Sequence, residues 1–140
     1  MVPALSPRGL MRPSMEFSRC VIDSSVFVAF YRDIDALHVD ALRVMQALAH
    51  TTLVVHPYVI QETATVLAYG SGMVVAKSFL SDIAIATNIE IPIVDVRHDM
   101  WLFENHTTKM SFTDISLIGL AKETNARLVT FDKQMLSLIK

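Results

Sequence analysis

The chain has 140 residues, which is enough for one domain with a substantial buried core. Hydrophobic residues make up 52% of it and the mean hydropathy is +0.42, values that exclude an intrinsically disordered chain. The formal net charge of −2 and the pI near 6.2 exclude a global basic field, so nucleic-acid binding would need local cations or a metal ion.

The first 18 residues differ in character from the rest. They mix proline, arginine and serine and lack the continuous apolar core of a secretory signal, so we expect a disordered leader over 1–18 and a single domain over 19–140. No stretch approaches the ~20 apolar residues of a membrane span. The single cysteine, Cys20, cannot form an internal disulfide and is predicted to be a buried, unreactive thiol. A reducing, cytoplasmic setting fits these features.

Short apolar runs predict four strands. In chain order they are residues 19–22, 51–56, 89–94 and 126–130. Pro92 lies inside the third run and has no N–H for a sheet hydrogen bond, which places that strand at an edge.

Between the strands, apolar residues recur with helical spacing. The predicted helices are residues 24–31, 34–50, 57–69, 73–87, 95–109, 114–124 and 133–139. Pro57 suits the first turn of its helix, and Gly70 with Gly72 is predicted to end that helix. Strands separated by helices indicate an α/β fold, a three-layer sandwich whose mostly parallel sheet of four or five strands is covered on both faces.

Carboxylates follow two of the predicted strands. Sites in such sheets form at the carboxyl ends of the strands, near the switch in strand order. Asp23 ends the first strand and Asp132 ends the last, so the two would meet if these strands are central neighbours. Asp95 follows the predicted edge strand and is expected to lie away from this centre.

Each acid of interest also has a purely structural explanation. Asp23 and Asp132 could each cap the following helix. Ser111-x-x-Asp114 matches a capping box. Glu62, taken alone, reads as a solvated acid on a helix. The functional interpretation therefore depends on the joint arrangement of the four.

That arrangement resembles the PIN-domain ribonucleases, specifically the short VapC-type toxins of VapBC toxin–antitoxin pairs. Three segments carry the resemblance: an apolar strand ending in Asp-Ser-Ser, a proline-led helix with an acid in its second turn, and Thr-Asp opening a helix that leads into Leu-Val-Thr-Phe-Asp-Lys. These segments are residues 21–25, 57–62 and 113–133. The resemblance extends from Cys20 to Ile139 and implies a PIN-like, Rossmann-like fold.

The resemblance also implies a set of site residues. Asp23, Glu62, Asp114 and Asp132 match the family's acidic quartet, and Ser24 and Thr130 match polar positions beside it. Carboxylates ~5 Å apart repel by about 3 kcal/mol per pair at an effective dielectric of ~20, so a cation is expected among them. All-oxygen sites suit Mg²⁺, with Mn²⁺ an alternative.

A divalent ion there would lower the pKa of a bound water and stabilise charge on a phosphodiester. We expect Asp23 and Asp132 to be direct ligands, and Asp114 to ligate directly or through water. Glu62 is expected to orient the water or to hold a second ion.

Cations for the RNA backbone are harder to choose from the sequence. Lys109, Lys133 and Arg32 are candidates, although each could equally be a solvated surface cation. The five histidines show no zinc-type spacing, and the glycine-rich phosphate-binding motifs are missing from the sequence.

The predicted function is a metal-dependent endoribonuclease, the toxin of a type II toxin–antitoxin pair. The alternatives are a non-catalytic PIN-fold module that binds RNA or protein, and a housekeeping RNA-processing nuclease. Residues 73–75 and 83–85 form a broad apolar helix surface, for which ordinary core packing is the simpler explanation. From it we expect a homodimer and a groove for a cognate antitoxin.

Overall fold

Four short parallel strands form the centre of the protein. The computed structural model describes residues 18–139. The sheet has the order β3-β2-β1-β4, and each neighbouring pair is parallel. The strands are β1 (Arg19–Ile22), β2 (Thr52–Val54), β3 (Ile89–Glu90) and β4 (Arg127–Val129). The predicted α/β fold with a parallel sheet is confirmed, with four strands in the described chain.

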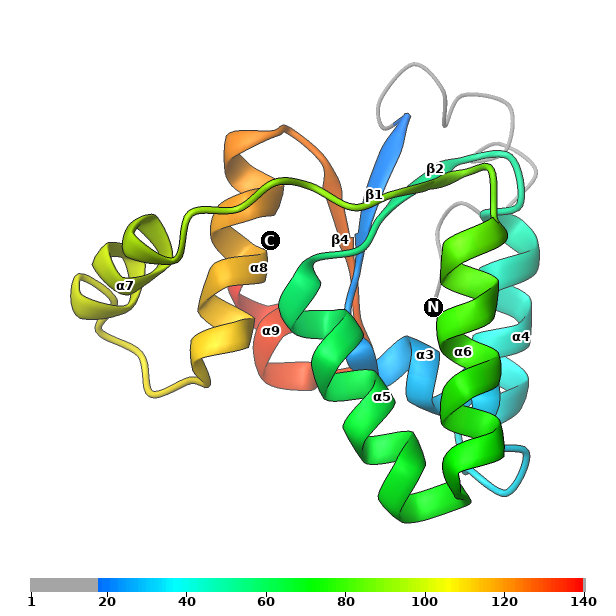
Figure 1. Ribbon diagram of the computed structural model, residues 1–140. Helices are drawn as coiled ribbons and strands as arrows, with labels where there is room; N and C mark the ends of the chain where they lie inside the picture. The colour runs from blue at the N-terminus through cyan, green and yellow to red at the C-terminus, as the bar shows by residue number, and fades with distance from the viewer. Residues whose placement is uncertain (1–17, 140) are drawn as a thin grey trace.

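Helices cover both faces of this sheet. They are α3 (Ser24–Tyr31), α4 (His38–Ala47), α5 (Pro57–Ser71), α6 (Met73–Ile85), α7 (Val96–Glu104), α8 (Phe112–Glu123) and α9 (Lys133–Leu138). Figure 1 shows α8 and α9 on one side of the sheet and α3, α4 and α6 on the other. Such a three-layer arrangement buries the apolar strands on both faces.

The chain reverses direction across the sheet between β1 and β4. From β1 it proceeds to β2 and then to β3, and it returns past β1 to form β4 at the opposite edge. The carboxyl ends of β1 and β4 therefore flank the switch in strand order, the place where ligands bind in open parallel sheets. The two strands are neighbours, as predicted, but β4 is an edge strand and only β1 is central.

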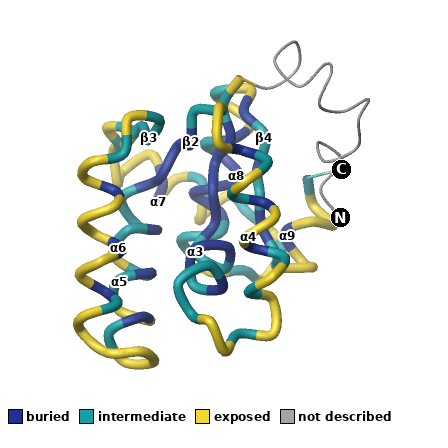
Figure 2. The backbone as a smooth tube through the Cα atoms, turned by 90° about the vertical axis from the view of Figure 1, so that its right-hand side faces the viewer, coloured by how far each residue is buried: buried dark blue, intermediate teal, exposed yellow. Residues whose placement is uncertain are grey.

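The core lies between the sheet and the helices. Its fully buried side chains include Val21 and Ile22 from β1, Val54 from β2 and Phe79 from α6. Figure 2 shows the buried residues concentrated in the strands and the exposed ones along the outer faces of α5 and α6. Cys20 is 3% exposed, and burial raises the pKa of its thiol, so the predicted unreactive thiol is consistent with its surroundings.

Several predicted boundaries are wrong. The helix predicted over 34–50 starts only at His38, because Asp35 accepts a hydrogen bond from the Leu37 backbone N–H at 2.8 Å and closes a turn there. β3 ends at Glu90, before Pro92. Its predicted edge position is nevertheless confirmed.

Two further helix ends differ from the prediction. Gly70 lies inside α5, and the chain turns only at Gly72, whose φ of 98° suits glycine. α7 ends at Glu104, short of the predicted 109. The predicted leader over 1–18 lies outside the described residues except for Ser18. Within residues 18–139, no helix has both the length and the apolar character that crossing a membrane requires.

Candidate functional site

The four predicted acids line one open hollow of about 490 Å³. Asp23 follows β1 and Asp132 follows β4, so the parallel sheet brings both to the same edge. Glu62 comes from the second turn of α5, and Asp114 from the first turn of α8. Four segments that are distant in the sequence thus supply carboxylates to a single pocket.

Asp23 is the most buried of the four, at 4% exposure. Its Oδ2 accepts hydrogen bonds from the hydroxyls of Ser25 and Thr130, each at 2.7 Å. Its backbone N–H donates to the Val129 carbonyl at 3.0 Å. Although Asp23 occupies the N-cap position of α3, its side chain makes no capping bond, so the structural explanation by capping does not account for it.

Two backbone N–H groups complete this hydroxyl network. The N–H of Phe131 donates to Ser25 Oγ at 3.1 Å, and that of Asp132 donates to Thr130 Oγ1 at 3.0 Å. Each hydroxyl therefore accepts one hydrogen bond from the turn after β4 and donates one to the Asp23 carboxylate. The turns after β1 and β4 are locked together at the site.

Glu62 is half-buried, and a hydrogen bond from Ser24 holds its carboxylate close to Asp23. The Ser24 hydroxyl lies 2.5 Å from Glu62 Oε2 and 3.5 Å from Asp23 Oδ1. Because a hydroxyl has one proton, the shorter contact is the hydrogen bond. Glu62 therefore faces the site and is not a solvated helix acid.

Asp114 carries the clearest electrostatic signature. Burial, followed by the negative charge of Asp23, raises its pKa to about 6, with smaller contributions from Asp132 and Glu62, while a hydrogen bond from Ser111 acts in the opposite direction. Ser111 Oγ also accepts from the Asp114 backbone N–H at 3.1 Å, so the predicted cap is present as well.

Asp132 both caps a helix and lines the site, so the structural and the functional interpretation of this residue hold together. Its Oδ1 accepts from the Met135 N–H at 3.1 Å and caps α9, as a structural role would require. Its side chain is exposed and lines the hollow. Capping uses one carboxylate oxygen, which leaves the other available to a ligand.

Two residues of the site were not predicted from the sequence. Asp35 adds a fifth carboxylate to the lining of the hollow, and Ser25 supplies one of the two hydroxyls on Asp23. Asp35 lay within the helix predicted over 34–50, but the structure has a loop there, so the predicted period did not give the direction of its side chain. Ser25 had a signal, since it follows Asp23 at the end of a strand, but its hydrogen bond depends on β4.

The donor set fits a hard divalent cation. It consists of carboxylates and hydroxyls, which are the oxygen ligands that Mg²⁺ and Mn²⁺ prefer. Among residues 18–139, however, no three acidic, histidine or cysteine side chains stand so that they could hold one ion without moving. Burial and, after it, the negative charge of Asp23 raise the pKa of Asp114, and a bound ion would oppose both effects.

The three candidate cations lie outside the lining of this hollow. Lys109 and Lys133 are exposed. Arg32 is partly buried at the end of α3. None of them makes an ion pair within the described chain.

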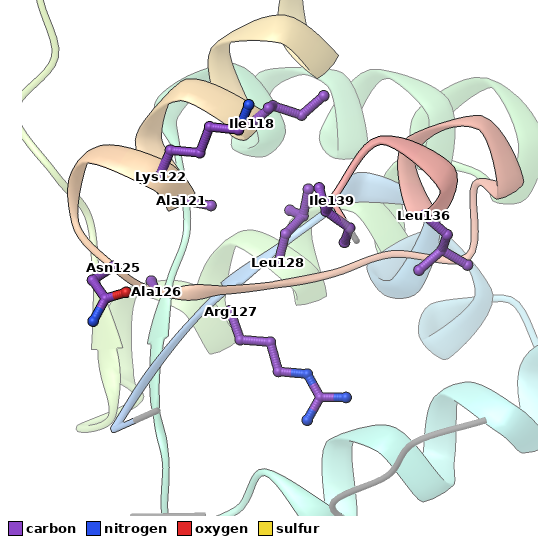
Figure 3. A pocket seen from close by; sticks show the side chains of 9 residues that line it. All are labelled: Ile118, Ala121, Lys122, Asn125, Ala126, Arg127, Leu128, Leu136 and Ile139. Carbon is purple, nitrogen blue, oxygen red and sulfur yellow. The ribbon is translucent and has the colours of Figure 1, made fainter. Parts of the chain in front are cut away.

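A separate hollow of about 430 Å³ lies beside β4 (Figure 3). Its walls are mainly apolar, with Lys122 and Arg127 at its rim, and in Figure 3 the Arg127 side chain points to the other side of β4 from Lys122. None of the four acids contributes to it. The acid-lined hollow is therefore the candidate for chemistry.

Comparison with known families identifies the fold. The model of the PIN domain family matches residues 20–139, nearly all of the described chain. The chain belongs to the PIN domain family. This confirms the family predicted from its three motif segments.

Among solved structures, this PIN domain is similar to VapC20 of Mycobacterium tuberculosis, described as a toxin that cleaves the sarcin–ricin loop. The TM-score is 0.73 with 20% sequence identity, over 85% of this chain and 94% of that one. At this identity the likeness establishes a shared fold with a VapC toxin. A comparison with curated proteins finds no match.

Proposed function

We propose that this PIN domain is a metal-dependent endoribonuclease that hydrolyses phosphodiester bonds of RNA. The observation that carries the proposal is the convergence of Asp23, Glu62, Asp114 and Asp132 on one hollow at the switch between β1 and β4. Like charges that converge on one partly enclosed hollow repel one another unless a cation compensates them, which supports a metal-binding function for the cluster.

Asp23 and Asp132 are the proposed direct ligands of Mg²⁺ or Mn²⁺, with Asp114 as a direct or water-mediated ligand. When bound, the ion would supply charge stabilisation on the phosphodiester and an acidified water. Small movements of Asp114 and Asp132 would complete the site, because Asp132 is exposed and Asp114 is only half-buried.

The chain's own residues prepare this chemistry. Ser25 and Thr130 hold the Asp23 carboxylate in one orientation, since both hydroxyl protons point at its Oδ2. Glu62 keeps one oxygen on the Ser24 hydroxyl and has the other free to accept a proton from the attacking water. The sheet fixes Asp23 and Asp132 as neighbours before substrate arrives.

The proposed biological role is that of a toxin controlled by a cognate antitoxin in the cytoplasm. The fold shared with VapC20 supports it. An exposed apolar groove of about 520 Å³ between α5 and α6 also supports it; Tyr69 and Met73 line this groove, and Val74 beside them is 84% exposed. Of the predicted apolar surface, Ile83 is instead buried in the core, whereas Ile85 is 74% exposed. We also propose that apolar surface of this kind supports a homodimer.

RNA cleavage tests the nuclease directly. Wild-type protein and the Asp23→Asn variant are incubated with structured RNA in Mg²⁺ or Mn²⁺, with and without EDTA. Asp33→Asn is the matched control, because Asp33 is an exposed acid outside the hollow. We expect cleavage by wild type and Asp33→Asn only in the presence of metal, and none by Asp23→Asn. Equal cleavage in all samples, or none in any, would contradict the proposal and favour a non-catalytic module.

Expression in cells separates the toxin from a housekeeping nuclease. We expect growth arrest when the wild-type protein is expressed and normal growth with Asp23→Asn. Relief of the arrest by a co-expressed neighbouring gene product would support a toxin–antitoxin pair. Normal growth with an active wild-type enzyme would instead indicate RNA processing.

A further inference from the structure

One row of side chains on α3 leads away from the acids. Ser24 and Val28, one turn apart, both line the acid-lined hollow. Arg32 follows one turn later, and its backbone N–H donates to the Val28 carbonyl at 3.0 Å. The row therefore starts at Ser24, which donates a hydrogen bond to Glu62, and ends at the guanidinium of Arg32.

A matching row lies on α5, which packs against α3. Glu62 and Val66 line the same hollow, and Gly70 follows after one more turn. A Cβ atom at Gly70 would lie 3.6 Å from the Arg32 Cζ, so the guanidinium rests against the bare backbone of α5. The two rows thus end at the same contact, one helical turn beyond the residues that line the hollow.

The Arg32 side chain has an unsatisfied hydrogen-bond donor. Its Nε is buried and has no hydrogen-bond partner among the residues that the structure describes, which is rare for a charged donor. The described chain gives it no ion pair. Asp35, which lines the hollow from the loop after α3, accepts a hydrogen bond from the Leu37 N–H with one carboxylate oxygen. The buried Nε is closed to a ligand, but the guanidinium as a whole is partly exposed, so its outer nitrogens are suited to an incoming anion.

We propose that Arg32 binds a backbone phosphate of the RNA, one helical turn beyond the residues of α3 and α5 that line the hollow. This inference rests on the proposed nuclease function and adds a second contact point for the substrate. Eight residues of helix separate Ser24 from Arg32, about 12 Å at a rise of 1.5 Å per residue. For a strand that advances about 3.4 Å per stacked nucleotide, or more when splayed, the phosphate lies about two to four nucleotides from the scissile bond.

A structural role would look different in solution. A cation near the C-terminal end of α5 could simply stabilise the helix dipole. In that case Arg32→Ala would lower the melting temperature and leave the salt dependence of RNA binding unchanged. A phosphate contact predicts the reverse pattern.

The experiment compares Arg32→Ala with Arg97→Ala as a matched control. Arg97 is exposed on α7, across the molecule from α3 in Figure 1. Binding of a fluorescent single-stranded RNA is measured by anisotropy in EDTA over a range of salt concentrations, and cleavage is measured separately in Mg²⁺. We expect Arg32→Ala to weaken binding about tenfold and to reduce the slope of log K against log salt by about 0.7, and Arg97→Ala to change neither.

Replacing each RNA phosphate in turn with a neutral methylphosphonate locates the contact. One position, about two to four nucleotides from the cut, should weaken wild-type binding and cause no further loss with Arg32→Ala. An unchanged salt slope in Arg32→Ala, or equal losses for both proteins at every position, would overturn the inference. Absence of cleavage by wild type would refute the nuclease function alone, because the binding measurements need no catalysis.

Discussion

Asp23 and Asp114 differ in how the surrounding residues stabilise their negative charges. Asp23 is nearly buried, and the hydroxyls of Ser25 and Thr130 both donate to it. Within the described chain, Asp114 has only the hydrogen bond from Ser111 to stabilise its charge. Burial and, after it, the negative charge of Asp23 raise its pKa to about 6. One carboxylate is therefore held in place, while the other is kept at an energetic cost that a bound cation would offset.

Removing the charge of Asp114 should stabilise the folded protein at neutral pH. A carboxyl group whose pKa is raised by folding contributes stability below its unfolded pKa and loses it as pH rises through the folded value of about 6. We therefore expect Asp114→Asn to melt at a higher temperature than wild type at pH 7, with a smaller difference at pH 4, and to lose RNA cleavage. Thermal melts of both proteins at the two pH values check this. A lower melting temperature for Asp114→Asn at pH 7 would contradict the account.

Thr130 tests the hydroxyl network. Thr130→Val removes the donor to Asp23 and the acceptor for the Asp132 N–H, so we expect a loss of about 1–3 kcal/mol in unfolding free energy and a marked loss of cleavage. Thr124→Val is the control, because the Thr124 hydroxyl bonds only the Leu120 carbonyl at the end of α8. Denaturant unfolding and cleavage rates measure both effects. If the two variants lost cleavage equally, the network would have no special role.

Single residues also show where sequence reasoning stops. Asp23 and Asp132 follow strands and Asp114 opens a helix, so their direction could be inferred from the element that carries each. Asp35 was predicted to lie in a helix but lies in a loop, so its position in the hollow could not be inferred from a helical period. The same limit applies to Arg32, whose contact with Gly70 joins two helices.

At the level of elements, starts were easier to predict than ends. Pro57, Asp95 and Asp132 mark helix starts through a fixed φ or local hydrogen bonds, and the structure has a helix start at each. The predicted starts at 34 and 114 were less accurate, since α4 begins at His38 and α8 at Phe112. Ends depend more on packing: α5 continues through Gly70, because glycine is tolerated in a helix that is held by its neighbours. β3 stops early because its neighbour β2 has only three residues.

Two glycines in the α5–α6 hairpin provide an element-scale prediction. Gly72 has a φ of 98°, so Gly72→Ala forces a side chain into a strained conformation and should destabilise the protein by about 1–2 kcal/mol. Gly70 is helical and a Cβ there meets only ordinary contacts, so Gly70→Ala should stabilise it by up to about 1 kcal/mol. Urea unfolding of both variants measures the difference. The same sign of change in both would contradict the assigned helix end.

For the whole molecule, the order of the strands explains why these four segments make one site. The reversal between β1 and β4 opens a crevice at their carboxyl ends, and α5 and α8 bring Glu62 and Asp114 to it. Alternation of strands and helices predicted this architecture. The sequence alone did not predict that the carboxylates would stand apart without an ion, because that spacing depends on side-chain conformations.

Protons and metal should compete for the assembled site. In the proposed metal site the ionised form of Asp114 holds the ion, so with a pKa of about 6 this carboxyl would bind the ion more weakly at lower pH. We expect the lower pH midpoint of RNA cleavage to fall as the Mg²⁺ concentration is raised, in wild type and in the control Asp33→Asn. Rate profiles from pH 4.5 to 8 at several Mg²⁺ concentrations measure it, and a midpoint that is independent of Mg²⁺ would show that the ion does not meet Asp114.

The most direct test of the account is Mn²⁺ binding followed by electron paramagnetic resonance in wild type, Asp23→Asn, Asp132→Asn and Asp33→Asn. If the ends of β1 and β4 share one ion, Asp23→Asn and Asp132→Asn should each weaken the same binding event at least about tenfold, while Asp33→Asn should bind as wild type does. Wild-type affinity in both Asp23→Asn and Asp132→Asn would show that the acids do not form a common metal site.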